Sequence, residues 1–543
     1  MLNALVNTPA PQNEPVLSYA PESAERTALK AELRRQRAES IEIPLFIGGR
    51  EVRTHKTGNA VMPHYHRHVL ASYHIAEAVE IEQAIAAARK AKTSWAALPW
   101  EARAAIFLKA AELLTGPRRA RVNAANMLGA SKTAHQAEID GVCELADFWR
   151  FGAAYAQRIC EEQPISAPGT WNYMDHRPLD GFVLAVTPFN FLSIAGNLPT
   201  APALMGNTVL WKPASSAVYQ AWHVLEVLRE AGLPDGVINL VTTSGATVSQ
   251  EILPHPNLAG IHFTGSTEVF RHMWATIGSN IDRYSQYPRI VGETGGKDFI
   301  FAHASADPEA LVAAIIRGGY EFQGQKCSAV SRVYIPDNLW PRLSEHLVAE
   351  IKRIRVGDVA DFRNFMGAVV DRGAFASITG FIEKARTSPA THILAGGAYD
   401  DSEGYFIQPT LVRADDPLHP LMCEEIFGPV VTLYVYPEAD FESTLHLCDT
   451  TSPYALTGAI FARDRTAIVK ASQVLRFAAG NFYINDKPTG AVVGQQPFGG
   501  SRASGTNDKA GSVLNLLRWV SPRAIKETFA PATSYPYPFM AAE

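Results

Sequence analysis

Cys327 is the residue best suited to covalent chemistry in this 543-residue sequence. It stands in the run GQKCSA (residues 324–329), whose small side chains would give a substrate close access to sulfur. A neighbouring cation lowers the pKa of a thiol, so we expect Lys326 to help activate Cys327 as a nucleophile. The alternative is a buried structural cysteine, which is the commoner fate of an unpaired one.

Glu293 and Asn190 are candidate partners for that thiol. Glu293 opens the run ETGGK (residues 293–297) after an apolar stretch, and two following glycines let the backbone bend while the carboxylate points into a cleft. It can act there as a general base. Asn190 follows another apolar stretch, where its amide can stabilise an oxyanion. The alternatives are an exposed or helix-capping Glu293 and an Asn190 that holds its own turn.

Two further runs carry groups suited to a phosphate-bearing ligand. Lys212 ends one strand-like stretch, and the run FTGST (residues 263–267), with Gly265 and Ser266, ends a later one. Backbone and hydroxyl donors at a helix N-terminus suit a pyrophosphate. The sequence has no GxGxxG motif, so this run is a weak indication by itself. The run EEIFGP (residues 424–429) predicts a sharp turn and nothing more.

The elements that would position these residues alternate between strand and helix. In the first series we expect strands at 181–186, 208–211, 237–241, 260–263 and 289–291, with helices at 193–205, 216–231, 246–253 and 267–277. In the second we expect strands at 299–302, 331–334, 430–436, 459–461 and 480–484, with helices at 308–320, 339–354 and 373–386. Such alternation predicts two α/β domains with parallel sheets and a cleft between them.

The first 160 residues predict a different organisation. Residues 1–40 read as a peripheral extension with a helix near 25–37. A hairpin is expected over 44–53, where two glycines supply the turn. Helical periodicity follows at 81–95, 101–114 and 138–159.

Composition excludes several classes of protein. A net charge of −5 gives no basic surface for nucleic acid, and no apolar run reaches the ~18 residues of a membrane span. Five cysteines without a CxxC pair favour a reducing compartment. Residues 1–20 lack Lys and Arg, so no signal or transit peptide is visible and a cytoplasmic location is expected. For a eukaryotic chain that has already been processed, the mitochondrial matrix fits equally well.

No metal site is expected. His64, His66 and His68 alternate and would share one face of a strand, but no nearby acid or cysteine completes a ligand set.

Taken together and in order, six of these segments resemble the aldehyde dehydrogenase superfamily over nearly the whole chain. They are PFNF (188–191), KP (212–213), FTGS (263–266), ETGGK (293–297), GQKC (324–327) and EIFGP (425–429). The resemblance implies an α/β fold with a Rossmann-like NAD-binding domain, an α/β catalytic domain and a small β oligomerisation flap. The implied bounds are an N-terminal extension at 1–40, the dinucleotide domain at 41–161 and 179–296, the catalytic domain at 297–511, and the hairpin and tail at 162–178 and 512–543.

The resemblance also implies a role for each matching residue. Cys327 corresponds to the nucleophile, Glu293 to the general base for hydrolysis, and Asn190 to an oxyanion donor beside the backbone N–H of Cys327. The residues implied to bind the cofactor NAD are Lys212 (adenosine ribose), Gly265 and Ser266 (pyrophosphate), Glu425 (nicotinamide ribose) and Phe427 (nicotinamide). Those implied to bind the substrate are Ser328, Gly490 and Ala491 at its carboxylate and Phe498 along its channel.

Further stretches at 136–140, 148–151, 481–487 and 494–508 resemble the branch of the superfamily that oxidises L-glutamate γ-semialdehyde to glutamate in proline catabolism. This implies a cysteine thiohemiacetal and thioester, and a homodimer or higher homo-oligomer. The chain is too short to add a proline dehydrogenase domain. The rival hypotheses are another semialdehyde or general aldehyde dehydrogenase, a CoA-acylating enzyme, and a non-catalytic protein that kept the fold.

Overall fold

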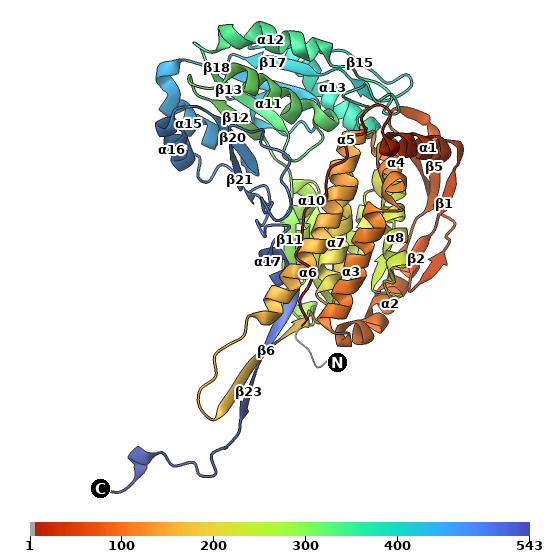
Figure 1. Ribbon diagram of the computed structural model, residues 1–543, viewed down its shortest axis with the longest axis vertical. Helices are drawn as coiled ribbons and strands as arrows, with labels where there is room; N and C mark the ends of the chain where they lie inside the picture. The colour runs from red at the N-terminus through yellow and green to blue at the C-terminus, as the bar shows by residue number, and fades with distance from the viewer. Residues whose placement is uncertain (1–5) are drawn as a thin grey trace.

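Two seven-stranded sheets occupy separate halves of the molecule in the computed structural model, which describes residues 6–543 (Figure 1). The first sheet has the order β11-β10-β7-β8-β9-β2-β3, and its five strands from β11 to β9 are parallel. The bounds of all seven strands are β2 Leu45–Ile47, β3 Arg50–Val52, β7 Phe182–Thr187, β8 Thr208–Pro213, β9 Ile238–Leu240, β10 Leu258–Thr264 and β11 Arg289–Glu293. The five predicted strands and the predicted hairpin are confirmed.

Strand β7 shows how the first sheet is buried on both faces. Val183 and Ala185 belong to one hydrophobic core, and Phe182 and Leu184 to another on the opposite face. This follows from the alternation of side chains along a strand. The first core is covered by α3 Trp100–Thr115, α4 Arg119–Ala130, α6 Leu145–Glu161, α7 Leu192–Leu204 and α8 Val218–Ala231, and the second by α2 Ala78–Ala97 and α10 Thr267–Ser279.

Two features of this half differ from the expected helices. The segment Glu138–Glu144 is a π-helix that leads into α6, where one continuous α-helix was expected. Helix α4 was not expected at all. It is buried on almost every side, and its polar Asn123 and Asn126 interrupt any amphipathic period.

The second sheet has the order β14-β17-β18-β13-β12-β20-β21, parallel except for β14. Its strands are β12 Asp298–Ala302, β13 Val330–Pro336, β14 Thr391–Ala395, β17 Thr410–Ala414, β18 Val430–Tyr436, β20 Thr457–Phe461 and β21 Asn481–Ile484. Its helices include α11 Pro308–Tyr320, α12 Trp340–Arg353, α13 Arg372–Thr387, α15 Phe441–Thr450 and α16 Arg465–Val474. The α/β class of the fold is therefore as expected, although β14, β17, α15 and α16 were not anticipated.

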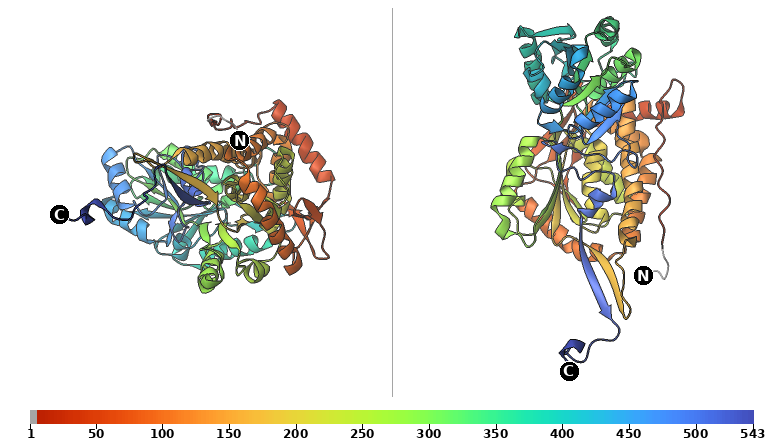
Figure 2. Two further views of the ribbon diagram at one scale, coloured as in Figure 1. Left: turned by 90° about the horizontal axis from the view of Figure 1, so that it is seen from below. Right: turned by 90° about the vertical axis from the view of Figure 1, so that its left-hand side faces the viewer.

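A two-stranded arm projects from the body (Figure 1 and the right-hand view of Figure 2). Strand β6 (Thr170–Pro178) pairs antiparallel with β23 (Val520–Thr528) over nine residue pairs. The expected pairing within 162–178 is therefore wrong, because the ladder partner comes from the tail. Gln163 contacts β6 through its side-chain amide. The amide oxygen accepts from the Met174 N–H at 2.7 Å, and the amide nitrogen donates to the Met174 carbonyl at 3.2 Å.

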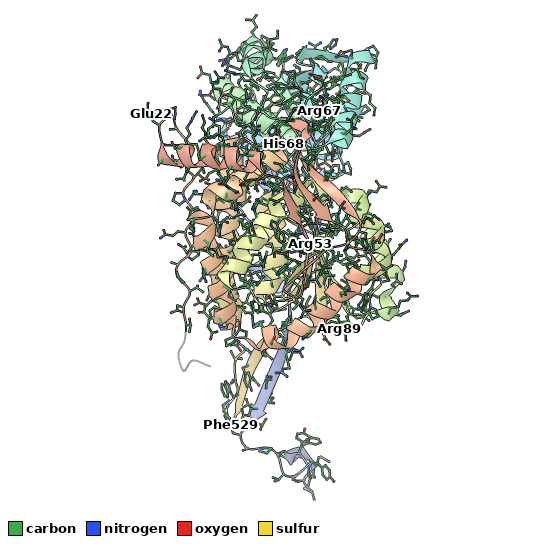
Figure 3. All side chains as sticks on the ribbon, turned by 90° about the vertical axis from the view of Figure 1, so that its right-hand side faces the viewer. Glu22, Arg53, Arg67, His68, Arg89 and Phe529 are labelled. Carbon is green, nitrogen blue, oxygen red and sulfur yellow. The ribbon has the colours of Figure 1, made fainter. Side chains whose placement is uncertain are left out.

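Both chain ends depart from the expected bounds. The N-terminal region is not peripheral, because α1 (Ala24–Ala38) buries Leu29 and Leu33 in the first core. At the other end α17 (Val513–Leu517) and Trp519 also pack into that core, so the projecting tail begins only with β23. Figure 3 shows Phe529 at the end of the arm, where the tail leaves β23.

Candidate active site

The carboxyl ends of the parallel strands in the first sheet gather five of the candidate residues. Asn190 follows β7, Lys212 lies in β8, Gly265 and Ser266 follow β10, and Glu293 is the last residue of β11. The Ser266 hydroxyl caps α10 by accepting from the Val269 N–H at 3.3 Å. Open α/β sheets bind ligands at this edge, so the arrangement suits an extended ligand lying across several strands.

Cys327 lies beyond a turn of unusual backbone conformation. Residues 322–324 have φ of +51°, +56° and +65°, in the left-handed region that costs a non-glycine residue about 1–3 kcal/mol. The buried Gln323 side chain holds this turn, donating to the carbonyls of Ser131 at 3.0 Å and Ala368 at 2.7 Å. The strain is therefore fixed by contacts outside the loop, which aim Cys327 into the cleft.

The Cys327 thiol is only 8% exposed. Burial raises the pKa of the Cys327 thiol well above its usual value, and the carboxyl groups of Asp298, Glu425 and Glu293 raise it further. The free protein therefore holds this cysteine as a neutral thiol at neutral pH.

Lys326 does not activate the thiol as the sequence suggested. Its ammonium is buried and pairs with the Glu321 carboxylate at 3.1 Å. Burial also lowers the pKa of Lys326, which the Glu321 charge opposes. Although Lys326 is next to Cys327 in the sequence, its ammonium is paired with Glu321 instead of the thiol.

Glu293 lies beside Cys327 and Phe498, and all three line a pocket of about 40 Å³. One carboxylate oxygen of Glu293 accepts from the Gly500 N–H at 3.2 Å. Burial raises the pKa of Glu293 well above the ordinary carboxyl range, and the Gly500 hydrogen bond and Lys509 lower it only in part. The carboxylate of such a group is a stronger base than that of an exposed glutamate.

A cavity of about 440 Å³ opens above the thiol and receives residues from both halves of the chain. Cys327, Ser328, Gly490, Ala491 and Phe498 all line it. The Ser328 hydroxyl lies 2.8 Å from that of Thr489, and Gly490 has φ of +93°. The candidate substrate residues are thus brought together, with a hydroxyl pair and a glycine turn on one wall.

Glu425 and Phe427 lie on the opposite side of the Cys327 loop, where they line a narrow recess with Lys326. Glu425 accepts from the Gly296 N–H at 2.8 Å, and burial raises the pKa of Glu425 to about 7. The Phe427 ring packs edge-on against Phe189, with centroids 5.8 Å apart. These contacts join the second domain to loops at the edge of the first sheet.

The sequence matches the profile of the aldehyde dehydrogenase family over residues 51–522. The chain belongs to the aldehyde dehydrogenase family. It is 51% identical over 540 residues to the mitochondrial Δ1-pyrroline-5-carboxylate dehydrogenase of Dictyostelium discoideum, covering 99% of this chain and 97% of the relative. It is 49% identical over 529 residues to the mitochondrial enzyme of that name from Homo sapiens, covering 97% and 94%.

Solved structures agree with the sequence relatives. The Δ-pyrroline-5-carboxylate dehydrogenase from Mycobacterium tuberculosis bound with NAD is similar to this aldehyde dehydrogenase with 55% identity and a TM-score of 0.97, and each chain is covered completely. The 1-pyrroline-5-carboxylate dehydrogenase from Thermus with bound NAD shares 32% identity with a TM-score of 0.90, covering 96% of this chain and 100% of that one.

Glu144 is a cavity residue that the sequence analysis missed. It ends the π-helix and lines both the main cavity and the small pocket beside Cys327. The Ser193 hydroxyl donates to it at 2.7 Å, while burial and then Asp140 raise the pKa of Glu144 to about 8. Nothing in its own segment marks it, because one acid in a helical run is usually solvent-exposed.

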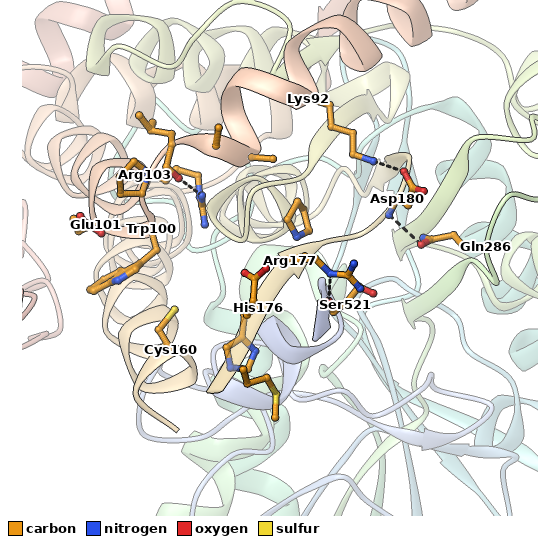
Figure 4. Close-up of a pocket in the computed structure, with 17 residues that line it drawn as sticks. Lys92, Trp100, Glu101, Arg103, Cys160, His176, Arg177, Asp180, Gln286 and Ser521 are labelled. Carbon is orange, nitrogen blue, oxygen red and sulfur yellow. Dashed lines mark hydrogen bonds and ion pairs between the residues drawn. The ribbon is translucent and has the colours of Figure 1, made fainter. Parts of the chain in front are cut away.

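The larger cavity in Figure 4, about 990 Å³, lies at the base of the arm. Arg103, Cys160 and His176 line it, and the Lys92 ammonium pairs with Asp180 at 2.8 Å on its rim. None of the candidate catalytic or ligand-binding residues lines this cavity. Size alone therefore does not identify the chemical site of this aldehyde dehydrogenase.

The histidine run has other partners. His64 lies in the turn between β4 (Thr57–Met62) and β5 (Tyr65–His74) and contacts the Ser131 hydroxyl at 3.2 Å, whereas His66 bonds the Asp401 carbonyl at 2.9 Å. Within residues 6–543, no three His, Cys, Asp or Glu side chains group as metal ligands. No helix in the same range is long and apolar enough to cross a membrane.

Proposed function

We propose that this aldehyde dehydrogenase oxidises L-glutamate γ-semialdehyde to L-glutamate with NAD as hydride acceptor, as the names of its relatives indicate. One observation carries the chemistry. A thiol and a carboxyl group, Cys327 and Glu293, share one enclosed pocket beneath a cavity shaped by both domains. Such a pair can form a covalent acyl intermediate and then release it to water.

Acylation begins when the Cys327 thiol gives its proton to water in the cavity and the sulfur attacks the aldehyde carbon. The new C–S bond converts the carbonyl oxygen to an oxyanion, which the Asn190 amide and the Cys327 backbone N–H stabilise. Both donors are fixed in advance, because Asn190 is buried and Cys327 follows a constrained turn. Collapse of this thiohemiacetal expels a hydride and leaves a thioester on Cys327.

Glu293 serves the second half of the reaction. Its carboxylate accepts a proton from water as the water oxygen attacks the thioester carbon, the C–S bond breaks and the carboxylic acid leaves. Because burial raises the pKa of Glu293, its carboxylate is a stronger base than that of an exposed glutamate. Water as the acceptor distinguishes this enzyme from a CoA-acylating relative, and CoA should leave its rate unchanged.

Residues at the first sheet's edge and two residues of the second domain fit NAD. Burial lowers the pKa of Lys212, which has no carboxylate within ion-pairing distance among the described residues and can donate to a ribose. Ser266 begins a 13-residue helix whose N-terminus attracts phosphate. A Cβ at Gly265 would lie 2.7 Å from the Phe263 ring, so this turn requires a glycine. Glu425 and Phe427 would hold the nicotinamide riboside, and bound NAD would supply the hydride acceptor.

The cavity offers groups for both charges of the amino-acid substrate. Ser328, Gly490 and Ala491 supply donors for the α-carboxylate at a glycine turn. Glu144, which also lines the cavity, offers a carboxyl group to the α-ammonium. Holding the far end of the substrate fixes how far its aldehyde carbon reaches toward sulfur.

We also propose a homodimer or higher homo-oligomer that works in a reducing compartment. The aromatic side chains of the tail are largely exposed, Tyr535 by 86% and Phe539 by 83%, and such patches commonly mark interfaces. Light scattering at micromolar concentration should give a multiple of the 59.1 kDa chain mass, and a monomer mass would reject the assembly.

All five cysteines are free, which fits reducing surroundings such as the cytoplasm or the mitochondrial matrix.

The catalytic assignment predicts different failures for two variants. Cys327→Ser should retain the fold and dinucleotide binding but lose aldehyde oxidation, because a hydroxyl is a far weaker nucleophile. Glu293→Gln should acylate and then stall, so that mass spectrometry finds an acyl adduct on Cys327 after mixing with aldehyde and NAD. Near-normal turnover by Cys327→Ser, or fast hydrolysis without adduct in Glu293→Gln, would reject the corresponding role.

The substrate assignment is tested by Ser328→Ala. Losing a hydrogen bond to a charged group costs about 1.5–3 kcal/mol, or roughly 10- to 150-fold in kcat/KM with glutamate semialdehyde. Butanal, which has no carboxylate, should lose much less in the same NADH-absorbance assay. Equal losses with both aldehydes, or faster turnover of butanal than of the semialdehyde by the parent enzyme, would overturn the substrate while leaving the thioester chemistry intact.

A further inference from the structure

The N-terminal segment crosses the mouth of the substrate cavity. We call residues 13–17 the strap. It runs in extended conformation alongside α6 before α1 begins (Figure 1), and Asn13, Glu14 and Val16 line the cavity together with Cys327. The strap lies outside the stretch that matches the family profile, which starts at residue 51.

Glu14 fastens the strap to the first domain. Its carboxylate pairs with Arg119 at 2.6 Å and Arg150 at 2.7 Å, and its side chain is only 11% exposed. Its backbone N–H donates to Asp147 at 2.7 Å, and the Leu17 N–H donates to Glu138 at 3.0 Å. Charged and partly buried bonds of this kind hold a segment firmly. The strap is therefore a fixed part of the cavity wall.

Asn13 connects that wall to the loop after the glycine turn in the other domain. Its amide nitrogen donates to the Asp147 carboxylate and to the Val493 carbonyl, both at 2.8 Å. Its amide oxygen accepts from the Gln495 side chain at 2.9 Å. Val493 lies only three residues beyond Gly490, so one side chain ties α6 to the loop that carries the candidate carboxylate donors.

We propose that Asn13 is a positioning residue for substrate binding, which holds the 490–495 loop so that its backbone N–H groups converge on the α-carboxylate. This inference rests on the proposed function, whose substrate carries that carboxylate. A glycine turn adopts several conformations when it is unsupported, and small displacements of a binding group weaken binding. Asn13 supports the loop through hydrogen bonds to the Val493 carbonyl and the Gln495 side chain, and no other strap residue hydrogen-bonds either group.

Asn13→Ala should raise the KM for glutamate semialdehyde roughly 10-fold, the order expected for loosening one charge-assisted hydrogen bond, with kcat within about 2-fold. The change falls on KM because the carboxylate is held equally in the ground state and the transition state. The KM for butanal should stay unchanged. Thr8→Ala is the matched control, since Thr8 bonds Gln157 on the same helix at 2.7 and 2.9 Å without lining the cavity.

A side-chain exchange separates positioning from simple stability. In the double variant Asn13→Asp with Asp147→Asn, an amide again faces a carboxylate across the α6 contact, but residue 13 no longer donates to the Val493 carbonyl. We expect thermal stability near that of the parent, while the KM for glutamate semialdehyde remains raised. A KM restored together with stability would overturn the proposal, because the loop contact would then be irrelevant.

Reactivity of Cys327 gives a readout independent of substrate identity. Loosening the loop should open the cavity. Asn13→Ala should therefore react with maleimide at Cys327 at least several-fold faster than the parent and Thr8→Ala do, as measured from the mass of the Cys327 peptide. If the parent fails to oxidise glutamate semialdehyde, the proposed function falls, and faster alkylation still supports the positioning role. Unchanged KM in an active parent, or unchanged alkylation in either case, would overturn the role of Asn13.

Discussion

Burial of the reacting groups at the junction between the two domains is the constraint on which the rest of the site depends. Burial raises the pKa of both the Cys327 thiol and the Glu293 carboxyl group above their ordinary values, which disfavours the charged form of each. A neutral thiol resists oxidation and stray alkylation. The same low-dielectric surroundings strengthen every hydrogen bond that later meets an oxyanion. The site is therefore inert at rest and electrostatically effective when a charge develops.

The fold creates this buried junction by returning the chain to its starting domain. After the second sheet, residues 503–511 come back to β11, where the Thr506 N–H donates to the Gly292 carbonyl at 2.9 Å. Gly505 bridges to Glu293, and the Gly500 N–H bonds its carboxylate. The proposed general base, Glu293, thus lies on a strand of one domain and is covered by a segment that arrives from the other.

Local patterns in the sequence were sufficient to predict most strands and helices and to identify the candidate reacting groups. Short apolar runs between glycines and helices placed β7, β8, β10 and β11, and the residues at their ends follow from parallel topology. The role of Lys326 could not be read in this way, because its partner Glu321 depends on a left-handed turn. Nor could Glu144, whose cavity position arises from a π-helix within an apparently regular helical run.

Long-range pairings were beyond reach for a different reason. The arm joins residues near 174 and 524, and Asn13 reaches Val493 across 480 positions. No local propensity encodes such contacts, since a polar N-terminal segment looks the same whether it is free or packed. The N-terminal region therefore looked peripheral in the sequence, although it walls the cavity in the structure.

The most direct test of the account is the pH dependence of Cys327 alkylation in the protein without dinucleotide. Iodoacetamide reacts with the thiolate, so the rate at the Cys327 peptide reports the ionisation of that thiol. Because burial raises the pKa of Cys327, the rate should still be rising at pH 9, while free cysteine under the same conditions levels off earlier. A Cys327 rate that is already constant below pH 8 would show a stabilised thiolate at rest and contradict the account.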